Sequence, residues 1–374
     1  MVIGRGTSRF AFLAAISLAA LSAALGAPIT SGNFVLSRVS SSAALNGNAT
    51  AVFLDEYTPG GTLVQSIAVP TAAVGANFAL TMSGSATSEG GLTISPDGRY
   101  ITFGGYNAAV GTAGIATTTT ANFSRVVGRL DLSTGLVDTT TAFTDAFSGG
   151  NIRSAVTDGT NVWAVGSNTG VRATTFGTAG TSTSISTTLT NMRRIEIFNG
   201  QLYVSSASGL FQGVSAVGTG TPTTTGQTTT LLSGFPTASG PSPYDFWFAD
   251  ANTVYVADDR TSALGGIQKW TQSGGTWSLA YTMNTGLTSN ALRGLTGTVT
   301  GGIASLYATS GDNKFVTVAD NGATSAFLTL VTGASNNAFR GVEFAIGAAI
   351  PEPGTFALLG LAALPGVALL RRRK

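Results

Sequence analysis

Residues 291–332 read ALRGLTGTVTGGIASLYATSGDNKFVTVADNGATSAFLTLVT. Short runs of β-branched and aromatic residues alternate here with Gly, Asn and Asp, which favour turns. This alternation predicts four successive strands: one beginning at Leu292, an aromatic strand at Leu306, and two more at Lys314 and Ala326. Helix signals are few in this stretch and in the rest of the chain between the two termini, which indicates an all-β protein.

The same order of patterns recurs along the chain. An aromatic strand following a turn appears as VWAVGS at Val162, LYVSSA at Leu202, VYVADD at Val254 and LYATSG at Leu306. The pattern apolar, Arg, any residue, apolar precedes such strands as IRSA at Ile152, MRRI at Met192 and LRGL at Leu292, and returns as FRGV at Phe339. In another unit, Tyr244-Asp245-Phe246-Trp247 occupies the equivalent place, with Asp instead of Arg. The aromatic residues Trp163, Tyr203, Tyr255 and Tyr307 are spaced by 40, 52 and 52 positions, which indicates a repeat architecture.

Four strands per unit and units of this length are typical of a β-propeller. We predict a six-bladed β-propeller over residues 27–350, closed by a C-terminal strand that removes free sheet edges. The first blade is expected to combine Phe34–Ser40, Ala51–Tyr57 and Thr62–Val69 with the closing strand Phe339–Ile346. The other blades are expected at 90–147, 152–190, 192–235, 243–284 and 291–332. Because the unit length is irregular, a seven-bladed propeller or another β-repeat, such as a β-helix or a pair of sandwiches, remains an alternative.

The repeated arginine is the strongest candidate for a site. The first strand of each propeller blade lines the central channel, so equivalent positions are expected near one mouth of that channel. Clustered guanidinium groups suit carboxylate, sulfate or phosphate. We therefore predict a mouth that binds an anionic ligand, such as an acidic polysaccharide. The alternative is that each arginine pairs with a neighbouring blade and only stabilises the ring. The predicted residues are Arg153, Arg193, Arg293, Arg340, Asp245 and Glu89.

The composition excludes several classes of chemistry. The chain has no Cys and no His, so it has no Ser-His-Asp triad, no cysteine nucleophile and no disulfide, and it lacks the usual ligands of zinc, haem and iron–sulfur clusters. No phosphate-binding loop motif occurs. We therefore assign no catalytic residue and expect no cofactor and no metal. The acidic pairs Asp55-Glu56 and Asp258-Asp259 could hold calcium or serve as the acid and base of a glycosidase. Adjacent strand residues point to opposite faces, so Asp55 and Glu56 are not expected to share a substrate, and turn capping and solvation are the favoured interpretation.

The first 26 residues have the order of a secretory signal peptide. Arg5 and Arg9 precede a run of apolar and small residues from Phe10 to Leu25, and Ala24-Leu25-Gly26 supplies small residues at the two positions that a signal peptidase reads. Two arginines here and four basic residues at the C-terminus account for six of the 19 Lys and Arg residues, and Glu352 for one of the 17 acidic residues. The segment between the two ends is therefore mildly acidic, with 13 basic and 16 acidic residues, and we expect no nucleic acid partner.

The C-terminal end, residues 351–374, carries three features in order. Pro351-Glu352-Pro353 precedes an uncharged run over 355–370, and Arg371-Arg372-Arg373-Lys374 ends the chain. The run is short for a spanning helix, and terminal arginines would keep that end in the cytoplasm. This order resembles the PEP-CTERM sorting signal of Gram-negative bacteria. The resemblance implies a transmembrane helix, recognition by the protease exosortase, cleavage near the P-E-P motif and an association with an exopolysaccharide matrix. A plain C-terminal membrane anchor is the alternative.

Together these features predict an exported, non-catalytic binding or scaffolding propeller. It is expected at the cell surface or in the extracellular matrix of a Gram-negative bacterium, after a transient stage in the inner membrane. Its expected partners are an exosortase-type protease and an anionic polysaccharide. The alternative is an extracellular calcium-dependent hydrolase or lactonase of propeller type, because propellers host both enzymes and binding modules.

Overall fold

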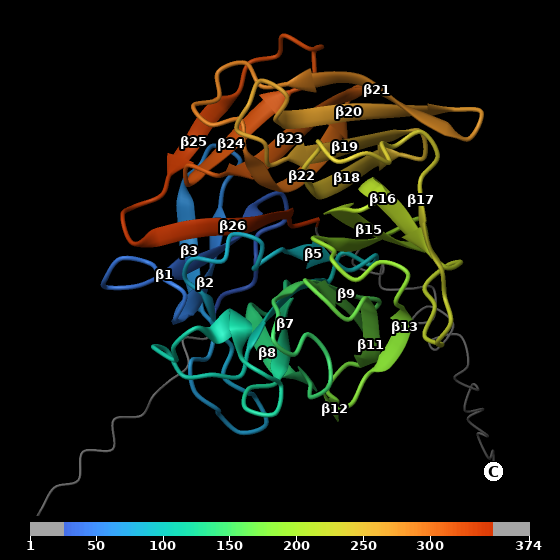
Figure 1. The fold of residues 1–374 in the computed structure, drawn as a ribbon. Helices are drawn as coiled ribbons and strands as arrows, with labels where there is room; N and C mark the ends of the chain where they lie inside the picture. Colours follow the sequence, from blue (N-terminus) through green and yellow to red (C-terminus); the bar gives the residue numbers. More distant parts are fainter. Residues whose placement is uncertain (1–25, 347–374) are drawn as a thin grey trace, which may run out of the picture.

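The computed structural model describes residues 26–346, which form six sheets arranged in a ring (Figure 1). The all-β, six-bladed β-propeller is therefore confirmed, and the seven-bladed and other β-repeat alternatives are excluded. The predicted signal peptide and C-terminal helix lie outside the described residues. Within residues 26–346, no helix combines the length and the hydropathy needed to cross a membrane.

The blades follow one another along the chain. The strand at the channel is the first strand of the blade in blades 2 to 6 and the closing strand in blade 1. From the channel outward, blade 1 contains β26 (Asn337–Phe344), β1 (Phe34–Ser40), β2 (Ala49–Tyr57) and β3 (Leu63–Ala68), with β4 (Met82–Ser83) also paired to β2. Blade 2 contains β5 (Thr93–Ile94), β6 (Tyr100–Tyr106), β7 (Arg125–Asp131) and β8 (Leu136–Phe143). Blade 3 contains β9 (Ile152–Thr157), β10 (Asn161–Gly166), β11 (Val171–Thr175) and β13 (Thr183–Ser186).

Blades 4 to 6 have the same order. Blade 4 contains β14 (Ile195–Phe198), β15 (Gln201–Ser208), β16 (Phe211–Val217) and β17 (Thr229–Leu231). Blade 5 contains β18 (Pro243–Asp250), β19 (Thr253–Asp258), β20 (Gly266–Ser273) and β21 (Thr276–Met283). Blade 6 contains β22 (Leu292–Thr300), β23 (Ile303–Ser310), β24 (Lys314–Ala319) and β25 (Leu328–Thr332). A 3-10 turn, η1 (Ile115–Thr117), follows β6, and β12 (Ala179–Gly180) pairs in parallel with β8.

The ring closes through the pairing of β26 with β1, the last strand with the first. The two strands are antiparallel, with Phe34 opposite Phe344 and Leu36 opposite Val342. Phe34 also packs on Tyr307 of blade 6, with ring centroids 3.9 Å apart. The predicted closing strand is thus present. Blade 1 therefore contains both the first and the last strand of residues 26–346.

Two kinds of sequence feature build each blade. Tight hairpins need residues with positive φ at both central positions, and Gly301 (φ 60°) and Gly302 (φ 82°) supply them between β22 and β23. Asn199 (φ 48°) and Gly200 (φ 74°) do the same between β14 and β15. Apolar side chains that alternate along the strands then fill the space between adjacent blades, where Trp163 is fully buried. The core therefore lies between the sheets, and the channel is left to the inner strands.

Candidate functional site

The repeated arginine stands at a β-bulge in three inner strands. In β9, Ile152 and Ser154 pair with consecutive residues of β10, so Arg153 is the extra residue. The registers of β22 with β23 and of β26 with β1 shift at the corresponding places, around Arg293 and Arg340. A bulge re-aims a side chain that regular pleating would direct elsewhere. Arg153, Arg293 and Arg340 therefore share both a position in the repeat and a β-bulge in the backbone.

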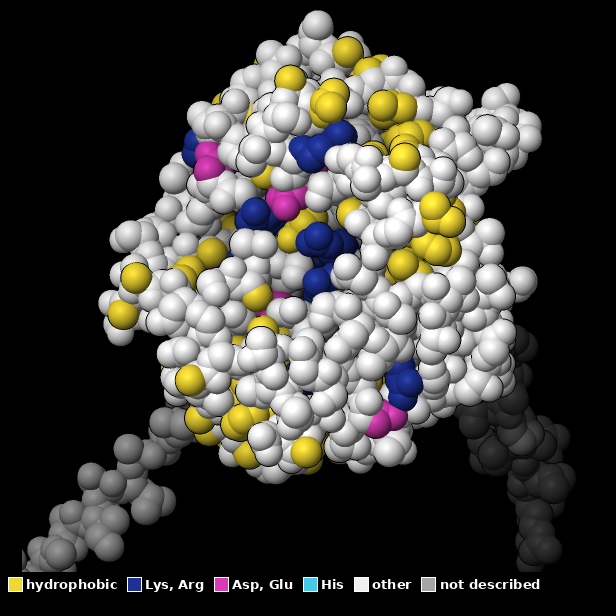
Figure 2. Space-filling model, in the orientation of Figure 1, with side chains coloured by type: hydrophobic (Ala, Val, Ile, Leu, Met, Phe, Trp, Pro, Cys, Tyr) yellow, Lys and Arg dark blue, Asp and Glu magenta, His cyan; other side chains and the backbone are white. Residues whose placement is uncertain are grey.

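The four arginines gather around Tyr244 at one end of the channel, and we call this group the arginine mouth. The guanidinium carbon of Arg193 lies 4.3 Å from the centroid of the Tyr244 ring, and that of Arg293 lies 5.9 Å from it. Tyr244 is also within electrostatic reach of Arg153 and Arg340. Figure 2 shows basic side chains gathered near the middle of one face, with acidic side chains beside them and a largely uncharged surface around.

Two of these arginines are buried and donate to neutral groups. Arg153 donates to Asn191 Oδ1 at 2.6 Å and to the Met192 carbonyl at 2.9 Å. Arg340 donates to the Gly84 carbonyl at 2.7 Å. Burial lowers the pKa of Arg153 to about 10, with the nearby charge of Arg193 as the next cause, and burial also lowers the pKa of Arg340. Their Nε atoms are buried and have no hydrogen-bond partner within residues 26–346.

The arginine mouth contains more guanidinium groups than carboxylates to neutralise them. Arg293 is paired with Asp259 at 2.7 Å. Among residues 26–346, no carboxylate forms an ion pair with Arg153, Arg193 or Arg340. The neutral contacts of Arg153 agree with a role in joining blades. Glu89 acts on Arg153 and Arg340 only from beyond ion-pair distance, so positive charge is in excess at the mouth. This charge is the chemical feature that favours an anion at the mouth.

Glu89 lies beside this group, just before β5, and its carboxylate is committed to hydrogen bonds. It accepts from the Ser83 backbone N–H at 2.7 Å and from Tyr106 Oη and Asn151 Nδ2, each at 2.5 Å. Burial raises the pKa of Glu89, against the lowering effects of these donors and of Arg340. Glu89 therefore mainly holds Ser83, Tyr106 and Asn151 in place at the edge of the arginine mouth, and it forms no ion pair with the arginines.

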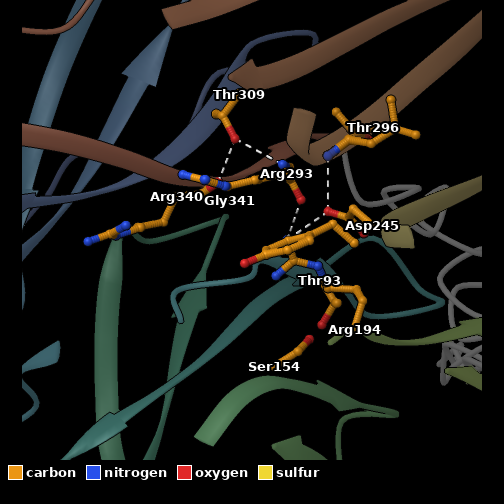
Figure 3. Close-up of polar contacts among 12 residues, drawn as sticks. Thr93, Ser154, Arg194, Asp245, Arg293, Thr296, Thr309, Arg340 and Gly341 are labelled. Carbon is orange, nitrogen blue, oxygen red and sulfur yellow. Dashed lines mark hydrogen bonds and ion pairs between the residues drawn. The ribbon is translucent and has the colours of Figure 1, made fainter. Parts of the chain in front are cut away.

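Asp245, predicted for the mouth, lies deeper in the channel. The register of β18 with β19 shifts between Pro243 and Phe246, and Tyr244 takes the place at the mouth. Asp245 instead pairs with Arg194 at 2.8 Å and accepts the Leu295 backbone N–H at 2.9 Å (Figure 3). The structure thus brings five of the six predicted residues to one region and places the sixth below them.

Hydroxyl groups on the second strands hold the inner strands in place. Thr309 accepts the backbone N–H of Gly294 at 2.9 Å and donates to the Arg340 carbonyl of the next blade at 2.5 Å (Figure 3). Ser37 bridges Gly341 and Gly90 in the same way, at 2.9 and 2.5 Å. The backbone beneath the arginines is therefore hydrogen-bonded from blade to blade, which keeps the arginine side chains preorganised.

Sequence reasoning missed two residues of this region, Tyr244 and Arg194. Arg194 occupies a position that holds Ser154, Gly294 and Gly341 in the repeats of other blades. The other units have a small residue at this position, whereas this unit has a long, charged one. That difference was the signal in the sequence for a side chain that crosses the channel. Tyr244 had no comparable signal, because its place depends on the bulge in β18.

The described region contains a cluster of guanidinium groups and no cluster of metal ligands. Guanidinium groups can bind the carboxylate or sulfate groups of a ligand. Within residues 26–346, no group of three or more acidic side chains is close enough together to hold a metal ion.

Comparison with known proteins places the chain in no family. No family model matches the sequence, and no curated protein matches it. Among solved structures, the chain is similar to a chain of the nidogen–laminin complex, with 13% identity, 83% of this chain and 97% of that chain covered, and a TM-score of 0.48. It is also similar to the periplasmic gluconolactonase of Pseudomonas aeruginosa, with 11% identity, 79% and 82% of the two chains covered, and a TM-score of 0.45.

Proposed function

We propose that this chain is an exported, non-catalytic binding propeller of the cell envelope or extracellular matrix. Its arginine mouth takes the carboxylate or sulfate groups of an acidic polysaccharide. The observation that carries this proposal is the set of three guanidinium groups, on Arg153, Arg193 and Arg340, that have no ion-pair partner among the described residues. A polyanion would supply the missing charge, and a repeating polymer would present it repeatedly.

The export route in this proposal rests on the two ends of the sequence. The first 26 residues act as a signal peptide, and residues 351–374 act as a PEP-CTERM signal processed by an exosortase-type protease. We expect the intact mass of the native protein to correspond to a chain that ends near Ile350, recovered outside the inner membrane. Full-length protein that stays in the inner-membrane fraction would contradict the sorting proposal and leave the binding proposal to its own test.

Replacing Arg193 by alanine is expected to weaken the binding of oligogalacturonate by about tenfold. A hydrogen bond to a charged group contributes about 1.5–3 kcal/mol, and Arg193 has no carboxylate partner that its removal would leave unpaired. Calorimetric titration of the wild type and the variant measures the change. Affinity for the wild type should also fall as salt is added, because ions screen the attraction.

Arg99→Ala is the matched control, since Arg99 is half exposed, lies away from the mouth and pairs with Asp131 at 3.2 Å. It is expected to bind oligogalacturonate as the wild type does. A neutral maltooligosaccharide of the same length should bind far more weakly. Equal affinity of Arg193→Ala and wild type, or equal binding of the neutral oligomer, would overturn the proposed function.

A further inference from the structure

A cavity lies at the other end of the channel from the arginine mouth. Its volume is about 370 Å³, and β14, β18, β22 and β26 contribute to its lining. The lining residues come later in the inner strands than the mouth residues do: Glu196 follows Arg193, and Glu343 follows Arg340. Because the inner strands run along the channel, this cavity opens at the opposite end. We call it the acidic pocket.

The walls of the acidic pocket are largely apolar and aromatic. Phe198, Trp247 and Phe344 line it. The Trp247 ring stacks on Tyr255, with centroids 6.0 Å apart and an interplanar angle of 27°. Its other neighbour is Gly297, where an added Cβ would come within 2.8 Å of the indole. Trp247 is thus held as a fixed wall by the tyrosine and by the missing side chain of the glycine.

Glu343 brings a buried carboxyl group to this apolar pocket. Its side chain is buried, and Oε1 accepts from Thr296 Oγ1 at 2.7 Å and from the Phe344 backbone N–H at 2.9 Å. Oε2 makes no hydrogen bond to any residue between 26 and 346. Burial raises the pKa of Glu343 to about 8. One oxygen is therefore fixed by the protein, and the other is left for a ligand.

The charges around Glu343 are unbalanced. Glu196, Asp245 and Arg194 are the charged groups that act on it, from blades 4 and 5. Arg194 is engaged by Asp245, so neither glutamate has an ion-pair partner among the described residues. Burial, followed by the charges of Asp245 and Glu343, raises the pKa of Glu196 well above its ordinary range. Two carboxyl groups thus face an apolar cavity, and the one cation near them, Arg194, is ion-paired with Asp245.

We propose that the acidic pocket binds an organic cation, a protonated amine carried on an aromatic or aliphatic body. Aromatic walls beside carboxylates are the environment that recognises such cations, through ring faces and charge-assisted hydrogen bonds. Calcium and magnesium prefer oxygen ligands on all sides, which these walls do not supply. The cavity volume lies in the lower part of the range for small-molecule sites, and so fits a single ring with a short chain.

The test uses the full-length protein and two probes of the same shape, 2-phenylethylamine and 2-phenylethanol. We expect the amine to bind at least tenfold more tightly than the alcohol at about pH 9. Because Glu343 holds a proton near neutral pH, the amine should release close to one proton at about pH 7, measured by calorimetry in buffers of different ionisation enthalpy. Its affinity should rise about tenfold between pH 7 and pH 9.

Glu343→Gln and Glu196→Gln separate the contributions of the two carboxyl groups. Each should weaken amine binding at about pH 9 by tenfold or more and leave alcohol binding nearly unchanged. Arg99→Ala, at a half-exposed residue that does not line the pocket, should bind both probes as the wild type does. Equal binding of amine and alcohol, saturable binding of neither, or wild-type amine affinity in both glutamine variants would overturn the inference. These results do not depend on the arginine mouth, so they leave the proposed function to its own test.

Discussion

Replacing Arg194 by methionine is expected to lower the free energy of unfolding by about 3–5 kcal/mol. Arg194 and Asp245 are buried at 4% and 1% exposure, and their ion pair at 2.8 Å lies inside the channel. Arg194 also donates to the Arg293 carbonyl of blade 6 at 3.2 Å. Removal of the guanidinium leaves the Asp245 carboxylate buried beside Glu196 without a counter-charge.

A second substitution separates the loss of charge from the loss of packing. Arg194→Met combined with Asp245→Asn removes both charges, so the double variant should recover at least half of the loss, measured by urea denaturation as a double-mutant cycle. Burial already raises the pKa of Asp245. The single Arg194→Met variant should therefore gain stability relative to wild type as the pH is lowered and Asp245 takes up a proton.

Arg99→Met is the control for the Arg194 variants. Arg99 pairs with Asp131 at 3.2 Å, but its side chain is 51% exposed, so its loss should cost less than about 1 kcal/mol. Gly91→Ala offers an independent route to the same defect, because an added Cβ would overlap the Arg194 guanidinium. If Arg194→Met cost no more than Arg99→Met, the buried pair would not be holding the channel together.

The number of blades could be predicted because each blade repeats one pattern. The expected first strand, Phe34–Ser40, is β1 with the same bounds, and the stretch 291–332 contains β22 to β25 in the expected order. Strand alternation and turn residues are local signals, so they can be recognised without knowing which strands pair with one another. The closing strand could be predicted as well, because Phe339 carries the same pattern as the other inner strands.

The arrangement of the channel could be predicted only in part. Arg153, Arg293 and Arg340 share a place in the repeat, and the structure puts a bulge at each. Whether Tyr244 or Asp245 faces the mouth depends on the pairing of β18 with β19, which no local pattern reports. The repeat therefore indicated which strand carries the site, and the backbone register decided which side chains reach it.

The acidic pocket was beyond sequence reasoning for a different reason. Glu196 and Glu343 come from blades 4 and 1, and only closure of the ring brings them into electrostatic reach of each other. Neither residue belongs to the repeated arginine pattern. Their raised pKa values are caused by burial, which depends on the blades that surround them.

The stability of the wild type is expected to fall as the pH rises from about 5 to about 9, and Glu343→Gln should remove a large share of this fall. Burial raises the pKa of Glu343 from 4.5 to about 8 in the folded protein. The folded state thus holds this proton more tightly than the unfolded state does. Its contribution to stability is fully present below about pH 4.5 and is lost as the pH rises through 8. The shift corresponds to about 4–5 kcal/mol at most.

Other acidic side chains also contribute to the dependence of stability on pH, so Glu343 accounts for only part of it. Burial also raises the pKa values of Glu89, Glu196 and Asp245, so they act in the same direction. Asp312 and Asp320 have lowered pKa values, so their stabilising effect is lost only as the pH falls below about 4. Between pH 5 and pH 9 the buried, raised groups therefore dominate the profile.

Urea denaturation of wild type and Glu343→Gln across this pH range measures the effect. Near pH 5 the two proteins should differ little, because glutamine replaces a carboxylic acid of the same shape that is already neutral. Near pH 9 the variant should be more stable by up to about 4 kcal/mol, because the wild type must then bury a charge or hold a proton against the solvent. Asp250→Asn, at an exposed carboxylate, should follow the wild-type profile. Parallel profiles for wild type and Glu343→Gln would show that Glu343 is ionised in the folded protein throughout, and that burial does not raise its pKa.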